Sequence, residues 1–209
     1  MPLSDKLATS LHRRDEKPNQ LLAREIAAAN DKKSVKELFK LLHSNNKSIQ
    51  SDVIKVIDEI AQLSPGLISQ YAKELIDLLD NKNNRLRWGA MIALNHITEE
   101  KPEMIFNSLG RIIAAADKGT VITNDHCINI LVKLGAIKKY WDDVFSLLFE
   151  RVLISPSNQL PTYAEKALPL VTAKNKDAFL KILTSRIGDV ESDTKRRRLK
   201  KLICKVPGY

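Results

Sequence analysis

One stretch of this chain, from Glu74 to Pro102, has a close copy 37 residues earlier, from Glu37 to Pro65. Both copies begin with Glu-Leu and end with Pro. Self-similarity at a period of about 20 to 50 residues is typical of repeat proteins, which stack one small unit several times. The sequence therefore favours a helical repeat array, an architecture that serves scaffolds, carriers and nucleic-acid binders alike.

The repeat extends over five expected helical pairs, which occupy residues 34–65, 66–101, 102–138, 139–173 and 174–206. Short polar links separate the helices, as is usual for helix connections. The expected helices are Ser34–His43 and Ser48–Leu63, Leu67–Leu79 and Asn84–Thr98, Pro102–Asp117 and Val121–Ile137, Tyr140–Ile154 and Leu160–Val171, and Lys176–Val190 and Thr194–Val206. Residues 1–33 are expected to form an N-terminal arm and a capping helix with Asn19 as its N-cap.

Four apolar columns run through the second helix of each pair when the five pairs are aligned. Their spacing of i, i+3, i+4 and i+7 places them on one helical face. A hairpin cannot bury such a face by itself, so neighbouring hairpins must stack to cover it. Cys127 lies in a column and is therefore expected to be a small core residue. The columns are Val53, Ala90, Cys127, Ala164 and Leu199; Val56, Ala93, Ile130, Ala167 and Leu202; Ile57, Leu94, Leu131, Leu168 and Ile203; and Ile60, Ile97, Leu134, Val171 and Val206.

The segment LLDNKNNRLRWGAMIALNHI, residues 78–97, resembles the HEAT repeat pattern, in which a turn Asp precedes a Val-Arg pair and an Ala-rich second helix. The resemblance implies an all-α fold: a right-handed α-solenoid of about five HEAT-like hairpins with an N-terminal helical cap. The matching residues are Asp80 for the turn, Leu86 and Arg87 for the pair, and Ala90, Ala93 and Leu94 for the core. At the arginine position the other pairs carry Gln50, Asn124, Pro161 and Arg196, so a continuous ladder of Asp and Arg is not expected.

The composition suits a reducing compartment. The two cysteines, Cys127 and Cys204, are far apart and show no CxxC spacing, so neither a disulfide framework nor a zinc knuckle is indicated. The first residues lack the apolar run of a signal peptide, and no run of about 18 apolar residues occurs. The sequence predicts a cytoplasmic protein.

The enzyme motifs with a known mechanical basis are missing from the sequence. Paired carboxylates, GxSxG, GxGxxG, phosphate-binding loops and HExxH do not occur. The four histidines are scattered over different units without metal-ligand spacing, and the adjacent Asp125 and His126 point about 100° apart on a helix. We therefore expect a protein that is not an enzyme, without catalytic residues, a bound metal or another cofactor.

The second-helix positions opposite the core columns are the expected binding surface. Trp often dominates binding energy, so Trp88 beside Ile92 on an otherwise polar ridge predicts a protein or peptide partner. An alternative is that Trp88 folds back over its own first helix or the adjacent unit. The expected binding residues are Trp88, Ile92, Asn95, Asp125, Asn129, Lys166, Arg197 and Lys201, and the preceding pair contributes Ser51, Lys55 and Asp58 to the same ridge.

The net charge of +9 is concentrated at the C-terminus, where residues 174–209 hold 11 Lys and Arg against 4 Asp and Glu. The run from Lys195 to Lys201 predicts a basic amphipathic helix, which is either a solvated cap or a contact for phosphates. Nucleic-acid binding is therefore the alternative function. Alkylpurine DNA glycosylases are also HEAT-like, but this chain is similar to them only in architecture and basicity, because Ile92 rather than an acid follows Trp88 by four residues.

One further aromatic residue has a structural explanation. Trp141 is expected to open a first helix and to pack in the core or at the cap, with Asp142 and Asp143 in the first turn favouring the helix N-terminus.

Overall fold

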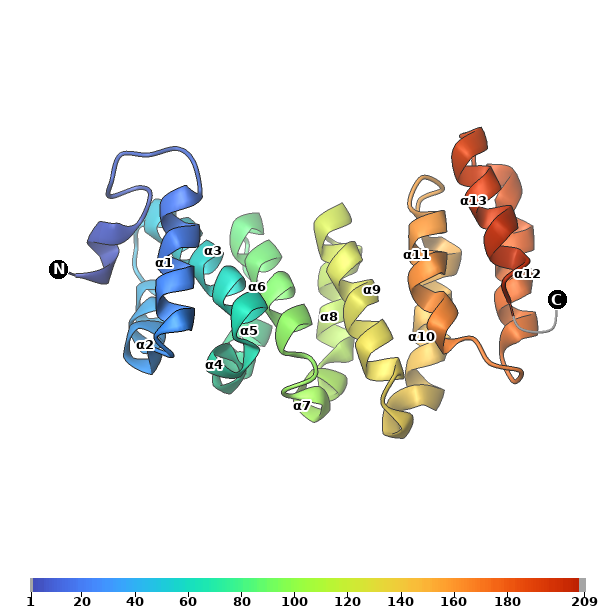
Figure 1. Cartoon of the computed structure of the whole chain (residues 1–209), viewed down its shortest axis with the longest axis horizontal. Helices are drawn as coiled ribbons and strands as arrows, with labels where there is room; N and C mark the ends of the chain where they lie inside the picture. The colour runs from blue at the N-terminus through green and yellow to red at the C-terminus, as the bar shows by residue number, and fades with distance from the viewer. Residues whose placement is uncertain (1, 207–209) are drawn as a thin grey trace. The chain divides into compact units, whose positions relative to one another are not determined.

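The computed structural model describes residues 2–206, and within that range all regular secondary structure is helical (Figure 1). Thirteen α-helices and five short 3₁₀ helices are present there, without a strand, which confirms the predicted all-α class. The chain divides into two compact units, Met1–Cys127 (unit 1) and Ile128–Tyr209 (unit 2). No helix between residues 2 and 206 is both long enough and apolar enough to cross a membrane.

Unit 1 contains a row of three helices, the N-terminal helix α1 and the second helices α3 and α6. Helix α3 packs against both α1 and α6, while α2, α4 and α5 cover the row from one side. Its elements are η1 (Leu3–Lys6), α1 (Lys17–Ala28), α2 (Lys32–Leu41), α3 (Lys47–Leu63), α4 (Pro65–Ile68), η2 (Ser69–Tyr71), α5 (Ala72–Leu78), α6 (Asn84–Ile97), α7 (Pro102–Asn107) and α8 (Leu109–Asp117). Helix α9 (Val121–Gly135) carries the boundary between the units.

Unit 2 contains two helical pairs. Helix α10 packs against α11 and α12, and α13 packs against α11 and α12. The elements are η3 (Lys138–Tyr140), α10 (Trp141–Ile154), α11 (Leu160–Ala167), η4 (Leu168–Leu170), α12 (Lys176–Arg186), η5 (Ile187–Asp189) and α13 (Asp193–Ile203).

The expected helices agree with these bounds within a few residues, but two first helices are interrupted. The expected helix Leu67–Leu79 is divided into α4, η2 and α5. The short 3₁₀ segment ends at Tyr71, whose ring stacks on Phe39 of α2 with 3.9 Å between ring centroids. The expected helix Pro102–Asp117 is divided into α7 and α8 at Ser108.

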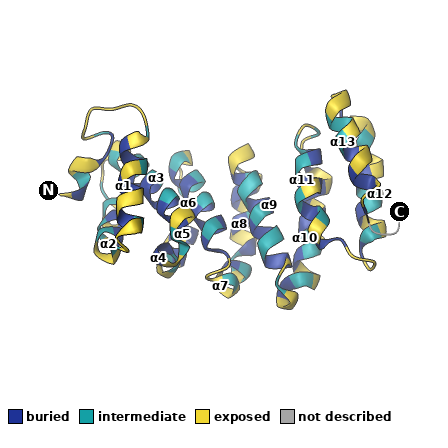
Figure 2. Ribbon diagram, viewed as in Figure 1, coloured by how far each residue is buried: buried dark blue, intermediate teal, exposed yellow. Residues whose placement is uncertain are grey.

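The four apolar columns form the core of both units (Figure 2). Every column residue is buried except Leu168, which is only partly buried. Leu168 begins η4, because Pro169 cannot donate the backbone hydrogen bond that would continue α11. The helical register therefore ends one turn earlier in this pair than the sequence pattern predicts.

The prediction that Asn19 is an N-cap is wrong. Helix α1 begins at Lys17 with Pro18 in its first turn, where the missing proline N–H costs nothing. Asn19 is buried, and its Oδ1 accepts the Ala8 backbone N–H at 3.0 Å. Asp52 of α3 accepts from Asn19 Nδ2 at 2.9 Å and from the Thr9 backbone N–H at 2.7 Å. These bonds hold the N-terminal arm against α1 and α3.

The side chains at the arginine position of the repeat close the hairpins. Gln50 Nε2 donates to the Leu42 carbonyl at 2.9 Å, and Asn124 Nδ2 donates to the Ala116 carbonyl at 2.9 Å. In the last pair Arg196 Nη2 donates to the Val190 carbonyl at 2.8 Å. All three satisfy carbonyl groups near the end of the preceding first helix or its 3₁₀ extension, which otherwise lack intrahelical partners.

The turn aspartate has a different partner from the one that an internal ladder would give it. Asp80 Oδ2 accepts from Arg111 Nη2 of α8 at 2.5 Å, whereas Arg87 donates to Asn84 on its own helix. The hairpins are therefore closed by hydrogen bonds that side chains donate to backbone carbonyl groups.

Candidate functional site

The exposed side of α6 carries the first predicted binding residues. Trp88, Ile92 and Asn95 follow one another at i, i+4 and i+7, which places them on one side of the helix. Trp88 and Ile92 are half-buried, so each retains apolar surface in contact with solvent. Asn95 is 5% exposed and therefore lies mostly beneath that surface.

Helix α9 joins this surface through a contact that the sequence did not predict. Asn95 Nδ2 lies 3.1 Å from His126 Nδ1. The neighbouring Asp125 is half-buried, and its Oδ1 is shielded from solvent without a hydrogen-bond partner in the described part of the chain. The contact between Asn95 and His126 thus joins α6, which carries Trp88, Ile92 and Asn95, to the part of α9 that carries Asp125.

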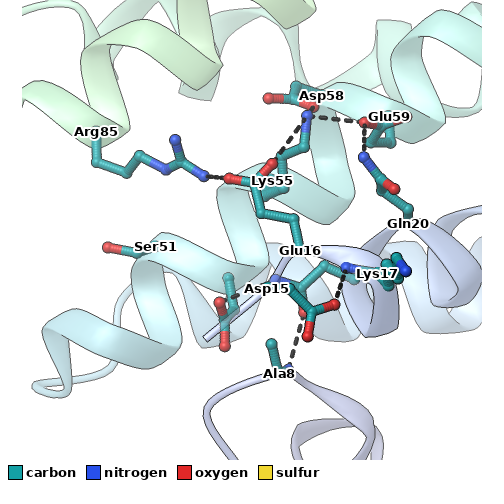
Figure 3. Close-up of polar contacts among 12 residues, drawn as sticks. Ala8, Asp15, Glu16, Lys17, Gln20, Ser51, Lys55, Asp58, Glu59 and Arg85 are labelled. Atoms are coloured by element: carbon teal, nitrogen blue, oxygen red, sulfur yellow. Dashed lines mark hydrogen bonds and ion pairs between the residues drawn. The ribbon is translucent and has the colours of Figure 1, made fainter. Parts of the chain in front are cut away.

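The equivalent side of α3 carries a charged cluster instead (Figure 3). Lys55 Nζ lies 2.7 Å from Glu59, 3.2 Å from Asp58 and 3.8 Å from Glu16. Glu16, which precedes α1, also pairs with Arg85 of α6. These contacts connect α1, α3 and α6, so the charges on this part of the ridge are satisfied within unit 1.

Burial changes the ionisation of this cluster. Burial raises the pKa of Asp58 to about 7, although the ammonium group of Lys55 opposes the change. Burial alone would lower the pKa of Lys55, but its bonds to Glu59 and Asp58 outweigh that effect and raise the pKa. A group that titrates near neutral pH therefore lies in the middle of the row of three helices.

The remaining predicted residues belong to unit 2. Asn129 and Lys166 are half-buried on α9 and α11, whereas Arg197 and Lys201 are exposed on α13. The predicted binding residues are thus divided between the two units.

A brace between α11 and α13 orders the surface of unit 2. Arg198 donates to Glu165 at 2.6 Å and 3.0 Å and reaches the Thr162 hydroxyl at 3.4 Å. The hydrogen bond from Arg198 lowers the pKa of Glu165, and the charge of Lys205 adds to the effect. A shallow groove of about 280 Å³ lies beside the brace and is lined by Glu165, Leu168, Arg198, Lys201, Leu202 and Lys205.

Trp141 is half-buried, which agrees in part with its expected structural role. Its ring packs against Phe145 with 4.8 Å between ring centroids. Trp141 also lines a pocket of about 530 Å³ in unit 2, which the sequence did not reveal because its walls come from loops and helix ends. The other lining residues are Gly135, Ala136, Lys138, Asp142, Thr172, Ala173 and Lys174.

Among residues 2–206 there is no group of three or more His, Cys, Asp and Glu side chains that could hold a metal ion. Cys127 is buried in its column, as predicted, and Cys204 is exposed.

Comparisons with known proteins identify the fold alone. The sequence matches no protein family and no curated protein. Two engineered proteins solved by the Northeast Structural Genomics Consortium have a similar structure. The first is 16% identical, with a TM-score of 0.62 over 100% of both chains. The second is 18% identical, with a TM-score of 0.61 over 97% of this chain and 95% of the other.

Proposed function

We propose that this protein is a non-enzymatic scaffold or adaptor, built as a right-handed α-solenoid of HEAT-like hairpins, that binds a protein or peptide partner through α6. The five successive helical pairs and their shared buried columns support a repeat architecture. The proposal includes the expected cytoplasmic location, and free thiols at Cys127 and Cys204 suit a reducing compartment.

The observation that carries the proposal is the half-buried state of Trp88 and Ile92. The equivalent residues of the preceding pair are Ser51 and Lys55, and Lys55 is satisfied by its own carboxylates. A partner that covers Trp88 and Ile92 would remove apolar area from water at about 25 cal/mol per Å². Such an aromatic and aliphatic pair is typical of the centre of a protein interface.

The polar neighbours define the partner's chemistry. Asp125 presents a carboxylate on α9, beside the His126 that contacts Asn95 of α6. We therefore expect a peptide with a large apolar side chain that covers Trp88 and a backbone N–H or a cation that reaches Asp125.

Selection from a displayed peptide library on the whole chain tests this function. Selected peptides should bind the Trp88→Ala variant at least about 30-fold more weakly, because truncation of a central Trp typically costs about 2 kcal/mol or more. Trp141→Ala is the matched control, since Trp141 is also half-buried but belongs to unit 2. Affinity that survives in a folded Trp88→Ala protein, or that falls equally in both variants, would contradict the proposal.

A further inference from the structure

The two units differ sharply in charge. Unit 1 holds 18 Lys and Arg against 17 Asp and Glu, whereas unit 2 holds 16 against 8. Unit 2 therefore carries nearly all of the net charge of +9. An excess of one sign on one compact unit favours a partner of the opposite charge.

Some basic side chains on the second helices are paired with carboxylates and others are not. In unit 1 Lys55 of α3 faces Glu59 and Arg85 of α6 faces Glu16, whereas Arg87 of α6 donates to Asn84. In unit 2 Arg198 is paired with Glu165. Several other cations on α11 and on or after α13 have no carboxylate within ion-pair distance among the described residues. We call four of them the basic face: Lys166, Arg197, Lys201 and Lys205.

The basic face has a regular geometry. Arg197 and Lys201 lie four residues apart on α13, a rise of about 6 Å along the helix, and Lys205 follows in the turn after it. Lys166 occupies on α11 the repeat position that Lys201 occupies on α13, and these two helices pack together. The brace between Arg198 and Glu165 joins the two helices, and Lys201 and Lys205 of the basic face line the groove beside it.

We propose that the basic face binds the phosphodiester backbone of duplex DNA. Its residues include no aromatic ring, so single-stranded bases would find nothing to stack on. The apolar side of α13 is buried through Leu199, Leu202 and Ile203, so it is not available for insertion into a membrane surface. Cationic side chains match the repeated phosphates of duplex DNA, which carries one negative charge per about 1.7 Å of helix axis.

This inference is independent of the peptide site proposed on α6. Binding is driven by neutralised phosphates, so it should be insensitive to sequence and should weaken steeply with salt. The Trp88→Ala variant should bind DNA as the wild type does.

Fluorescence anisotropy with the whole chain and a labelled duplex of about 20 base pairs tests the basic face, at salt concentrations from about 50 to 200 mM. The test variant combines Lys166→Gln, Arg197→Gln and Lys201→Gln. It should bind at least about tenfold more weakly at low salt. The negative slope of log affinity against log salt should become shallower by about 3.

The matched control removes the same charge from unit 1, by Lys32→Gln, Lys33→Gln and Lys36→Gln at exposed positions of α2. This control variant should retain the wild-type slope of log affinity against log salt. Equal losses in both triple variants, no binding by the wild type at low salt, or equal affinity for duplex RNA of the same length would overturn the proposal. Far-ultraviolet circular dichroism checks that each variant is folded.

A variant that is expected to bind DNA more tightly provides a second test of the basic face. Glu165 is the one acidic residue that lines the groove, and Glu165→Gln removes its charge and releases Arg198. We expect binding about two- to fivefold tighter at low salt, with a steeper salt dependence. Unchanged or weaker binding by a folded Glu165→Gln protein would contradict the basic face.

Discussion

Gly89 of α6 lies directly against Ile54 of α3. A Cβ atom placed on Gly89 would be 2.4 Å from Ile54 Cγ1, which is nearer than any ordinary van der Waals contact allows. We predict that Gly89→Ala destabilises unit 1 by roughly 1 to 3 kcal/mol, because overpacking outweighs the gain of about 1 kcal/mol in helix propensity. Urea unfolding followed by Trp88 fluorescence, with Trp141 replaced by Phe, measures the change.

Gly110→Ala is the control for this prediction, since Gly110 lies in α8 of the same unit and a Cβ atom there would have nothing within 4 Å. That substitution should leave stability unchanged or raise it by up to about 1 kcal/mol. A rise in stability for both variants would show that α3 and α6 do not approach each other at Gly89.

Asp58 should make the stability of unit 1 depend on pH near neutrality. Its pKa is raised by burial to about 7, so the folded state holds the proton more tightly than the unfolded state. The contribution of this proton to stability is complete below the ordinary carboxyl pKa of about 4 and is lost as pH rises towards 7. Asp58→Asn should therefore be more stable than the wild type at pH 8, by up to about 4 kcal/mol.

The comparison of Asp58→Asn with the wild type is made by urea unfolding at several pH values. The advantage of the variant should shrink by about 1.4 kcal/mol per pH unit between pH 7 and pH 4, because each unit of pKa corresponds to that free energy. Asp5→Asn is the control for loss of an exposed carboxylate in the N-terminal arm. A difference between Asp58→Asn and the wild type that stays constant with pH would mean that Lys55 keeps Asp58 ionised.

The helical pairs and their core could be predicted because they depend on local periodicity. The residues of one column, such as Val53, Ala90 and Cys127, recur at a fixed offset. The apolar spacing within each helix predicts which side is buried. The pattern failed at Leu168, where Pro169 ends the helix although the apolar spacing continues. Periodicity predicts which side faces the core and not where the backbone departs from α-helical geometry.

The polar contacts could not be predicted, because they join residues that are distant in sequence. Glu16, Lys55 and Arg85 come from three helical segments, and no local pattern pairs them. Asn19 resembled an N-cap by residue type, yet packing against the arm determines its contacts. The expected binding residues fall in two compact units, a division that the local spacing does not indicate.

The two cysteines should report unfolding separately. Cys204 is exposed and Cys127 is buried at 1% exposure, so a thiol reagent should modify one thiol of the native protein rapidly. Cys127 should react only as fast as unit 1 opens, and its rate should rise with urea. Cys204→Ser should abolish the fast phase observed by absorbance with an aromatic disulfide reagent, and two fast thiols in the wild type would contradict the buried column.

The N-terminal arm should be released when Asp52 is removed. Its carboxylate accepts both the Thr9 N–H and Asn19 Nδ2, and loss of an acceptor for buried donors costs about 1 to 3 kcal/mol. Arg13 and Arg14 are exposed beyond this anchor, so Asp52→Ala should increase the initial rate of tryptic cleavage there about tenfold, corresponding to about 1.4 kcal/mol of easier local opening.

Mass spectrometry of the first tryptic fragments measures the release of the arm. Asp5→Ala is the control, because the Asp5 side chain accepts from the neighbouring Ser4 hydroxyl and is exposed on the same arm. Leu7 and Ala8 of the arm are buried, so their packing is a second source of attachment. If Asp52→Ala is cleaved no faster than Asp5→Ala, burial of these two apolar side chains holds the arm and the hydrogen bonds to Asp52 contribute little.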